Sequence, residues 1–256
     1  MKIILDSEKS NIAIEDNEQQ RTIPLYSKES FELLSRWWIK VGWNQKYSYT
    51  FTWMGRPIIQ TPDDLLRIQE VICRLNPDVI IETGVAHGGA LVFYASLCQL
   101  MGKGRVIGVD IEIREHNRSA ILAHPMAHRI TLIQGSSIEK STVDHVQSLI
   151  QPNQTVMVVL DSCHEKDHVL KELDIYSAIV TKGSYLVATD GIMFDLHDTP
   201  RGKEVWTWNN PAAAVEAFAA KRKDFLLESP PWQFNESKLD KNVTCWPGAW
   251  LKKVQG

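Results

Sequence analysis

The pattern of apolar residues changes at Pro77, and the chain after it predicts a layered α/β structure. Five short apolar runs, rich in β-branched residues, follow one another at intervals of roughly 25 residues, with helical segments between them. They comprise residues 79–81, 105–109, 130–133, 156–160 and 184–188. Because these runs mostly lack polar alternation, they predict parallel strands buried on both faces. The series therefore predicts five successive βα units in a doubly wound, mostly parallel, Rossmann-like sheet.

The C-terminal part predicts the elements that complete this sheet. Asn210 followed by Pro211 indicates the start of a further helix. Residues 224–228 and the stretch from 242 to 251, bent at Pro247 and Gly248, predict closing strands. We therefore expect seven strands in all.

The N-terminal part has a different pattern. Residues 1–24 are mostly polar and predict a loosely held arm or a short hairpin. Apolar residues at helical spacing predict a helix over 30–43, and residues 61–64 (TPDD) open a second one, with the aromatic stretch 47–56 between them. We therefore expect an arm with a helical, aromatic cap over 1–60 and a cofactor-binding domain over 61–256.

Composition and charge narrow the classes of partner. The 256 residues are 44% hydrophobic, with a net charge of −3, and carry no run rich in Lys or Arg. Neither a nucleic acid nor an anionic membrane is therefore expected as a partner, and a small-molecule substrate fits better. The four cysteines are scattered, no signal peptide is evident and no apolar stretch reaches 18 residues. These features predict a cytoplasmic protein.

The candidate chemistry lies where the predicted strands end, because an open parallel sheet binds ligands beyond the carboxyl ends of its strands. The first strand end supplies a glycine turn, and the second ends in Asp110, an acid suited to a ribose diol. The predicted cofactor-binding residues are Glu82, Gly84, Ala86, His87, Gly88, Gly89, Asp110, Ser136, Ser137 and Asp161.

Two cofactors fit the first two strand ends. A nicotinamide dinucleotide usually uses a GxGxxG turn for its pyrophosphate, whereas this chain has GxxxGG with Glu82 two residues before the first glycine. A carboxylate is unfavourable beside pyrophosphate but suits the ammonium and sulfonium groups of S-adenosylmethionine. We therefore expect the methyl donor. A dinucleotide, or glycines that only form a tight turn, are the alternatives.

The fourth and fifth strand ends predict a metal site. Asp161 and Asp190 each follow a buried strand directly, and carboxylate oxygens suit a hard divalent cation such as Mg²⁺ or Mn²⁺. Such a cation would leave positions open for the oxygens of a substrate. In the alternative interpretation the two acids only orient the substrate or cap helices.

The strand series resembles the class I methyltransferases, and several segments resemble the family named for cephalosporin hydroxylase, which also contains sugar O-methyltransferases. These segments are 82–90 (ETGVAHGGA), 160–164 (LDSCH), 168–173 (HVLKEL), 183–187 (GSYLV), 209–211 (NNP) and 214–215 (AV), and the resemblance spans about residues 47–254. It implies a methyltransferase sheet that binds S-adenosylmethionine and magnesium. The expected acceptor is a hydroxyl of a sugar, glycoside or other polyhydroxylated metabolite.

The resemblance also implies roles for individual residues, and at one position this chain departs from the pattern of the related enzymes. His164 falls where enzymes like catechol O-methyltransferase keep a lysine general base, and a neutral imidazole suits that role near pH 7. We expect Asp161 to assist it. Related enzymes usually place two metal ligands at the fifth strand end, whereas this chain has Thr189 before Asp190. Thr189 is therefore expected as a weak third ligand.

Other motifs have competing interpretations. Residues 164–168 (HEKDH) match the zinc-protease pattern HExxH, but they follow a buried strand by two residues instead of lying within a long helix. Cys163 beside His164 is expected to be a small packed residue and not a nucleophile. His168, Trp208, Asn209 and Asn210 are the predicted substrate residues. For Asn210, capping of the next helix is equally expected.

Three classes of function follow. The first is an O-methyltransferase, the second is a different Rossmann-like enzyme that uses a dinucleotide, and the third is a non-catalytic relative that binds the cofactor. Trp37, Trp38, Trp43 and Trp53 favour a core or subunit-interface role over a substrate lid. Together with the resemblance, they predict a homo-oligomer.

Overall fold

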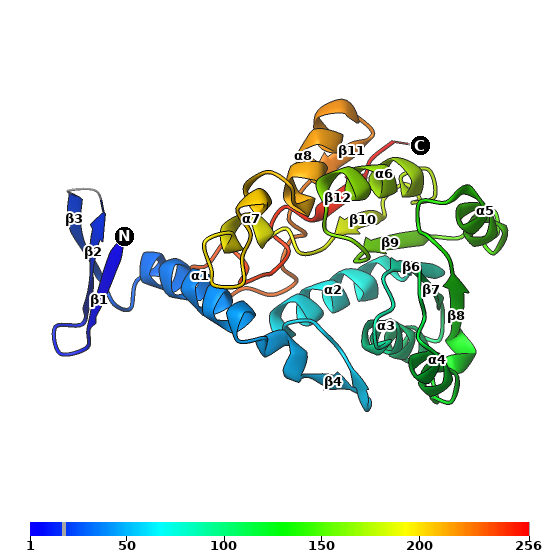
Figure 1. The fold of residues 1–256 in the computed structure, drawn as a ribbon, viewed down its shortest axis with the longest axis horizontal. Coiled ribbons are helices and arrows are strands. Elements are labelled where there is room, and N and C mark those ends of the chain that lie inside the picture. The colour runs from blue at the N-terminus through cyan, green and yellow to red at the C-terminus, as the bar shows by residue number, and fades with distance from the viewer. Residues whose placement is uncertain (17–18, 256) are drawn as a thin grey trace.

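A seven-stranded sheet forms the centre of the structure, a computed structural model that describes residues 1–16 and 19–255 (Figure 1). β12 is antiparallel to both of its neighbours, and the other adjacent pairs are parallel. In spatial order the strands are β11 (Phe225–Leu227), β12 (Trp250–Lys253), β10 (Tyr185–Ala188), β9 (Val156–Leu160), β6 (Val79–Thr83), β7 (Arg105–Asp110) and β8 (Ile130–Gln134). The predicted doubly wound, mostly parallel sheet is therefore confirmed.

Helices cover both faces of the sheet, and each face has its own core. Ile80 of β6 packs into one hydrophobic cluster and its neighbour Ile81 into the other, because successive strand residues point to opposite faces. The first cluster is covered by α2 (Pro62–Leu75), α3 (Gly89–Leu100) and α4 (Glu115–Leu122). The second is covered by α5 (Lys140–Ser148), α6 (Lys166–Tyr176) and α8 (Pro211–Lys221).

The chain reverses its direction across the sheet between β6 and β9. It passes from β6 to β7 and β8 on one side, and then returns to place β9 on the other side of β6. A glycine at position 84 makes this junction possible, because it has φ +96° and a Cβ there would lie 2.2 Å from the carbonyl oxygen of Asp161. Ligands of doubly wound sheets bind in the crevice at such a switch point.

The N-terminal arm is more ordered than the sequence predicts. Instead of a loose arm or short hairpin, β1 (Lys2–Asp6), β2 (Asn11–Asp16) and β3 (Gln19–Pro24) form a three-stranded antiparallel sheet. Ile12, Ile14 and Ile23 are buried in a small cluster of their own, which stabilises this sheet. Describing the whole N-terminal part as a helical cap was therefore wrong, although the predicted first helix is confirmed as α1 (Lys28–Asn44). Positions 17 and 18 of the arm lie outside the described residues.

The aromatic stretch after α1 connects the N-terminal region to the α/β layers. It forms the short 3₁₀ helix η1 (Tyr47–Thr50) and a hairpin of β4 (Thr52–Trp53) and β5 (Arg56–Pro57). The indole Nε1 of Trp53 donates to the Ser96 hydroxyl on α3 at 3.0 Å. The remaining short elements are η2 (Ala127–Arg129), α7 (Met193–Leu196) and η3 (Glu204–Thr207).

The last predicted strand begins later than expected. Residues 242–246 form a loop, and the strand β12 starts only at Trp250. The loop is held by Asp64 of α2, whose carboxylate accepts hydrogen bonds from the Thr244 hydroxyl, the Cys245 amide (2.8 Å) and the Thr61 hydroxyl (2.9 Å). Burial raises the pKa of Asp64 to about 6. Hydrogen bonding to this carboxylate thus competes with strand pairing for residues 244 and 245.

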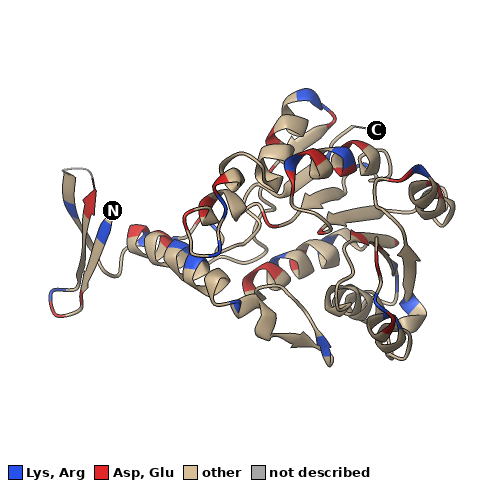
Figure 2. Cartoon of the chain, viewed as in Figure 1, with Lys and Arg blue, Asp and Glu red and all other residues tan. Residues whose placement is uncertain are grey.

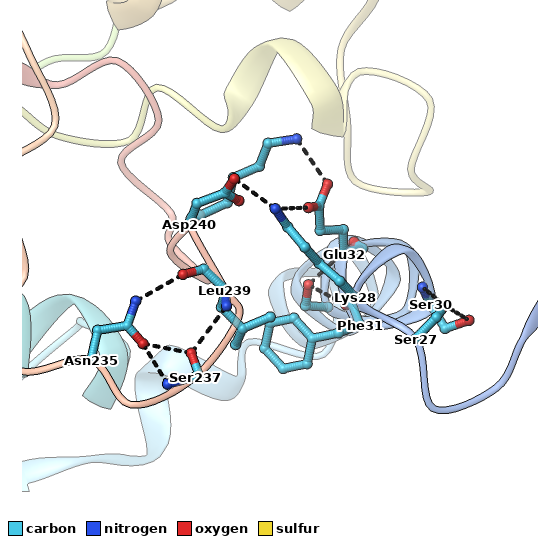
Figure 3. A network of polar contacts seen from close by, with 11 residues as sticks. Ser27, Lys28, Ser30, Phe31, Glu32, Asn235, Ser237, Leu239 and Asp240 are labelled. Atoms are coloured by element: carbon cyan, nitrogen blue, oxygen red, sulfur yellow. Dashed lines mark hydrogen bonds and ion pairs between the residues drawn. The ribbon is translucent and has the colours of Figure 1, made fainter.

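Charged residues lie mainly on the helices and loops around the sheet, where positive and negative side chains are intermixed (Figure 2). One network joins α1 to the loop before β12. In it Lys28 pairs with Asp240 at 2.6 Å, and Lys241 pairs with Glu32 at 2.8 Å (Figure 3). Among the residues that the structure describes, none of the helices has the length and apolar character needed to cross a bilayer.

Asp64→Ala should lower the free energy of unfolding by about 2–3 kcal/mol, because it leaves the half-buried Thr244 and Cys245 donors without their acceptor. Urea unfolding of the wild type, Asp64→Ala and the exposed neighbour Asp63→Ala measures this effect. The Asp63 variant should stay within about 0.5 kcal/mol of the wild type. Equal losses in both variants would show that Asp64 does not anchor the loop.

Candidate functional site

The structure brings together three of the side chains that the sequence selected at the fourth and fifth strand ends. Asp161 follows β9, Asp190 lies two residues after β10, and His164 lies in the loop before α6. One ligand atom from each lies within 4.8 Å of the other two. His164 Nε2 is 3.5 Å from Asp190 Oδ2. Two carboxylates and an imidazole at these separations form a group that can hold a divalent cation.

Two side chains hold the Asp161 carboxylate in place. The Thr189 hydroxyl donates to Asp161 Oδ1 at 2.5 Å, and the Gln60 amide donates to Asp161 Oδ2 at 3.1 Å. Thr189 is 1% exposed, and its hydroxyl also lies 3.1 Å from the Leu160 carbonyl oxygen. The contacts of Thr189 therefore favour an orienting role for this residue over the weak metal ligation that we expected.

Gln60 is a site residue that the sequence did not reveal. It lies in the loop between β5 and α2, about 100 residues before Asp161 in the chain, and it is 6% exposed. No motif surrounds Gln60, and it reaches the strand ends only because the hairpin of β4 and β5 packs on the α/β layers. The N-terminal region thus supplies a polar group to the site.

The environment of Asp161 favours its protonated form. Burial raises the pKa of Asp161 to about 7, and the nearby negative charge of Asp190 adds to the rise. The electrostatic interaction with His164 and the hydrogen bond from Thr189 lower the pKa of Asp161 and so offset part of this rise. A cation bound between Asp161 and Asp190 would therefore compete with a proton near neutral pH.

Glu82 is the most unusual of the predicted cofactor residues. It is 1% exposed, and neither carboxylate oxygen has a hydrogen-bond partner among the described residues. Burial is the main cause that holds the pKa of Glu82 well above the usual range, and the charges of Asp161 and Asp110 add to it. The nearby Tyr94 hydroxyl offsets part of this rise, although its position does not meet the geometry of a hydrogen bond. A buried carboxyl group without donors is suited to a cationic ligand group and unfavourable for a pyrophosphate.

Asp110 shapes the turn after the first strand. Its Oδ2 accepts hydrogen bonds from the amides of Val85 (2.8 Å) and Ala86 (3.3 Å), and its Oδ1 accepts one from Glu112 (3.0 Å). These bonds hold Ala86 at φ +45°, a value that is uncommon for a residue with a side chain. A ribose-binding role for Asp110 stays a prediction. In that role the carboxylate would bind the ribose and hold the turn at the same time.

Packing explains the other two glycines of the turn. A Cβ on Gly88 would lie 2.3 Å from the Ile121 side chain, and one on Gly89 would lie 2.1 Å from the Pro57 carbonyl oxygen. Close packing thus requires glycine at both positions, and their contact with a cofactor stays a prediction. His87 is half-buried, and its carbonyl oxygen accepts a 3.0 Å hydrogen bond from Arg56 Nε.

A second polar cluster lies at the third and fourth strand ends. His168 Nε2 is 3.3 Å from the Ser137 hydroxyl and 3.4 Å from the Ser162 hydroxyl. Ser162 also donates to Glu172 Oε1 at 2.8 Å, and Glu172 is completely buried. His168 is thus tied to the predicted cofactor residue Ser137, while the half-buried Ser136 precedes it in the turn. Glu172 and Ser162 were not selected from the sequence.

The predicted substrate residues after β10 mostly have structural partners. Asn210 caps α8 by accepting the Ala213 amide at 2.9 Å, and its own amide donates to the Trp206 carbonyl oxygen at 2.8 Å. Asn209 Oδ1 accepts the Lys166 amide at 2.6 Å, at the start of α6. These contacts favour helix capping for both asparagines. Trp208 is 62% exposed and is free to contact a ligand.

The HExxH pattern does not form the arrangement of a zinc protease. His164 precedes α6 and lies with Asp161 and Asp190, whereas His168 lies within α6 and contacts Glu172 at 3.7 Å. The two histidines therefore belong to different clusters. Cys163 is half-buried and is not paired in a disulfide.

Known proteins resemble this chain over most of its length. Residues 45–254 match the model of a family described as rhamnosyl O-methyltransferase/CmcI. The rhamnosyl O-methyltransferase of Mycobacterium leprae is 28% identical over 144 residues, which cover 55% of this chain and 60% of that protein. The enzyme of the same name from Mycobacterium bovis is also 28% identical over 144 residues, covering 54% and 56%. The matched region thus spans less than two thirds of the length of these relatives.

Solved structures share the fold. The apo structure of CmcI-N160 superposes with a TM-score of 0.55 at 19% identity, covering 81% of this chain and 78% of that one. CmcI-D160 with Mg and SAM gives a TM-score of 0.53 at 18% identity and the same coverage. At these identities the likeness shows a common architecture.

The affinity of the site for Mn²⁺ should rise with pH. Below pH about 7 the Asp161 carboxyl holds a proton that the cation must displace, so affinity should fall about tenfold per unit below pH 7 and level off above it. Calorimetric titration between pH 5.5 and 8.5 measures the dependence. Asp161→Asn should weaken binding and flatten the profile. A wild-type affinity that does not change with pH would contradict the assignment.

Proposed function

The chain belongs to the rhamnosyl O-methyltransferase/CmcI family, and we propose that it transfers a methyl group from S-adenosylmethionine to a hydroxyl of a sugar, glycoside or other polyhydroxylated metabolite. The observation that carries this proposal is the cluster of Asp161, His164 and Asp190 after β9 and β10, beside the switch point. Support for a sugar acceptor comes from the relatives named rhamnosyl O-methyltransferase.

The methyl donor would lie beyond β6 and β7, over the turn that begins at Gly84. The buried carboxyl group of Glu82, which lacks a hydrogen-bond donor, suits the positive ammonium and sulfonium groups of this cofactor. Asp110 would accept hydrogen bonds from the ribose hydroxyls, and Ser136 and Ser137 would face the base. The CmcI-D160 structure, which has the same fold, contains SAM, and this supports the choice of cofactor.

Asp161 and Asp190 would hold a magnesium or manganese ion, and the donor set fits such an ion. A bound divalent cation lowers the pKa of a hydroxyl that it contacts and positions the acceptor. Gln60 and Thr189 would keep the Asp161 carboxylate in the orientation that this requires. Mg is present in the CmcI-D160 structure.

His164 would be the general base, a role that needs a neutral imidazole within hydrogen-bond reach of the acceptor hydroxyl. Its side chain is 34% exposed, and Nε2 points toward Asp190. As the acceptor oxygen bonds to the methyl carbon, the bond from this carbon to sulfur breaks and the electron pair stays on sulfur. The hydroxyl proton passes to His164 Nε2, and adenosylhomocysteine leaves.

Release of adenosylhomocysteine, measured against a panel of rhamnosides and other glycosides, tests this function. Turnover should appear with at least one glycoside, stop in excess EDTA and return with Mg²⁺ or Mn²⁺. Full activity in EDTA would remove the metal from the mechanism and leave Asp161 to accept a hydrogen bond from the substrate. The absence of turnover with every acceptor, despite binding of the cofactor, would favour a non-catalytic relative.

His164→Ala should lower turnover by roughly 10²-fold while leaving the affinity for S-adenosylmethionine nearly unchanged, because it removes only the proton acceptor. Steady-state rates and calorimetry measure the two quantities. His145→Ala, a histidine on the surface of α5, serves as the control and should retain full activity. If His164→Ala keeps its rate, the proton leaves by another group, and His168 is the next residue to test.

A further inference from the structure

The long loop between β11 and β12 borders an open groove that lies outside the cluster of Asp161, His164 and Asp190. The groove has a volume of about 1490 Å³, and its lining comes from residues 227–250. It is therefore large enough for a small-molecule ligand. Rings make up much of its wall, and the ring-bearing residues are Pro230, Pro231, Trp232, Trp246, Pro247 and Trp250. We call it the loop groove.

Trp232 is the half-buried aromatic residue of the loop groove. The Arg67 guanidinium lies 4.5 Å from the centroid of its ring. Both residues line the adjoining groove around Phe234, whereas Arg67 does not line the loop groove. Arg67 thus covers the ring on the side of the adjoining groove. The ring surface toward the loop groove can pack against a ligand, and aromatic rings supply large apolar contact area.

Two buried polar atoms beside the loop groove lack partners. Trp246 Nε1 and Asn242 Oδ1 have no hydrogen-bond partner among the described residues, and both side chains line the groove. Trp246 is 2% exposed. One atom is a donor and the other an acceptor, so a ligand hydroxyl, which can both donate and accept, suits either of them. Reaching them takes rotamer changes of the kind that are common on binding.

The charged side chains of the loop groove are paired within the chain. Glu228 lies 3.6 Å from Lys252 Nζ. Asp240 and Lys241 pair with side chains of α1 at 2.6 and 2.8 Å (Figure 3). Phosphates, carboxylates and cations bind best to free side chains of opposite charge. A neutral ligand with several hydroxyls therefore fits the loop groove better than a charged one.

The loop groove adjoins the candidate functional site. Pro247 lines the groove, and its carbonyl oxygen lies so close to Gly191 that a Cβ on this glycine would clash with it. The Ile192 amide donates to the Cys245 carbonyl oxygen at 3.1 Å. Gly191 and Ile192 directly follow Asp190. The segment before β12 thus packs against the residues after Asp190 and lines the loop groove.

We propose that the loop groove binds a neutral sugar unit of the acceptor, next to the unit whose hydroxyl receives the methyl group; this inference rests on the proposed function. A pyranose has apolar C–H faces, which pack on aromatic and proline rings. Its hydroxyls donate and accept hydrogen bonds. The loop groove supplies both kinds of partner without a free charge. The preferred acceptor is therefore a glycoside of two or more sugar units.

Methyl transfer to methyl α-rhamnoside and to a methyl α-dirhamnoside, which share the same terminal sugar, tests the proposal. In the wild type, kcat/KM for the disaccharide should exceed that for the monosaccharide about tenfold or more, through a lower KM. Trp232→Ala should reduce this ratio about tenfold. Ser229→Trp should do the same, because it places a large ring at an exposed position of the groove lining. Circular dichroism checks that both variants remain folded.

Phe234→Ala is the matched control, because Phe234 is 71% exposed in the same loop and does not line the loop groove. It should keep the wild-type ratio. Saturation-transfer NMR with the dirhamnoside, recorded without S-adenosylmethionine, measures binding separately from the reaction. The disaccharide should bind to the wild type and the Phe234 variant, and its binding should be lost in Trp232→Ala and Ser229→Trp.

The two readouts separate this proposal from the proposed function. Disaccharide binding that both groove variants abolish, without turnover of either rhamnoside, would support the loop groove and count against the proposed methyl transfer. Turnover with equal kcat/KM for the two acceptors in all four proteins would overturn the loop groove and leave the methyl transfer in place. Absence of disaccharide binding, or binding that neither groove variant weakens, would also overturn it.

Discussion

The structure depends on one electrostatic constraint, the concentration of carboxyl groups at a single edge of a buried sheet. Glu82 and Asp110 lie at the ends of β6 and β7, and Asp161 and Asp190 follow β9 and β10. Burial and the neighbouring negative charges raise the pKa of Glu82 and that of Asp161. Asp110 is stabilised by three backbone amides, and Asp161 by two side-chain donors. Glu82 has no such donor. Charged groups taken from water need partners, so this edge favours cationic ligands.

The carboxyl groups can gather at this edge because the backbone after β6 passes close to the backbone after β9 at the switch point. Gly84 allows the turn after β6 to touch the backbone of Asp161, and Asp190 adopts φ +57°, a left-handed conformation that aspartate tolerates. The N-terminal region is part of the same arrangement, because the hairpin before α2 delivers Gln60 to Asp161. Ion pairs from α1 to Asp195 and Asp198 fix the segment that follows Asp190. Changes in α1 would therefore reach the segment that follows Asp190.

The sequence predicts this site well where its residues follow buried strands. Runs such as 156–160 lack polar alternation because both faces are covered, and parallel strands bring their ends to one edge, so Asp161 and Asp190 could be placed together. Gln60 could not be assigned to the site from the sequence, because only packing between distant parts of the chain brings it to Asp161. The roles of Thr189 and Asn209 depend on hydrogen bonds to residues distant in sequence. The strand predicted at 242–246 failed because buried Asp64 binds that segment instead.

Calorimetric titration of the protein with S-adenosylmethionine and with NAD⁺, each in the presence of Mg²⁺, tests the central claim that this edge is built for a cationic methyl donor. We expect one molecule of S-adenosylmethionine to bind per chain with micromolar affinity, about −8 kcal/mol, and NAD⁺ to bind at least a hundredfold more weakly. The physical reason is the buried Glu82, because a positive ligand group stabilises its ionised form, whereas a pyrophosphate would oppose that ionisation. Tight binding of NAD⁺ without measurable binding of S-adenosylmethionine would contradict it.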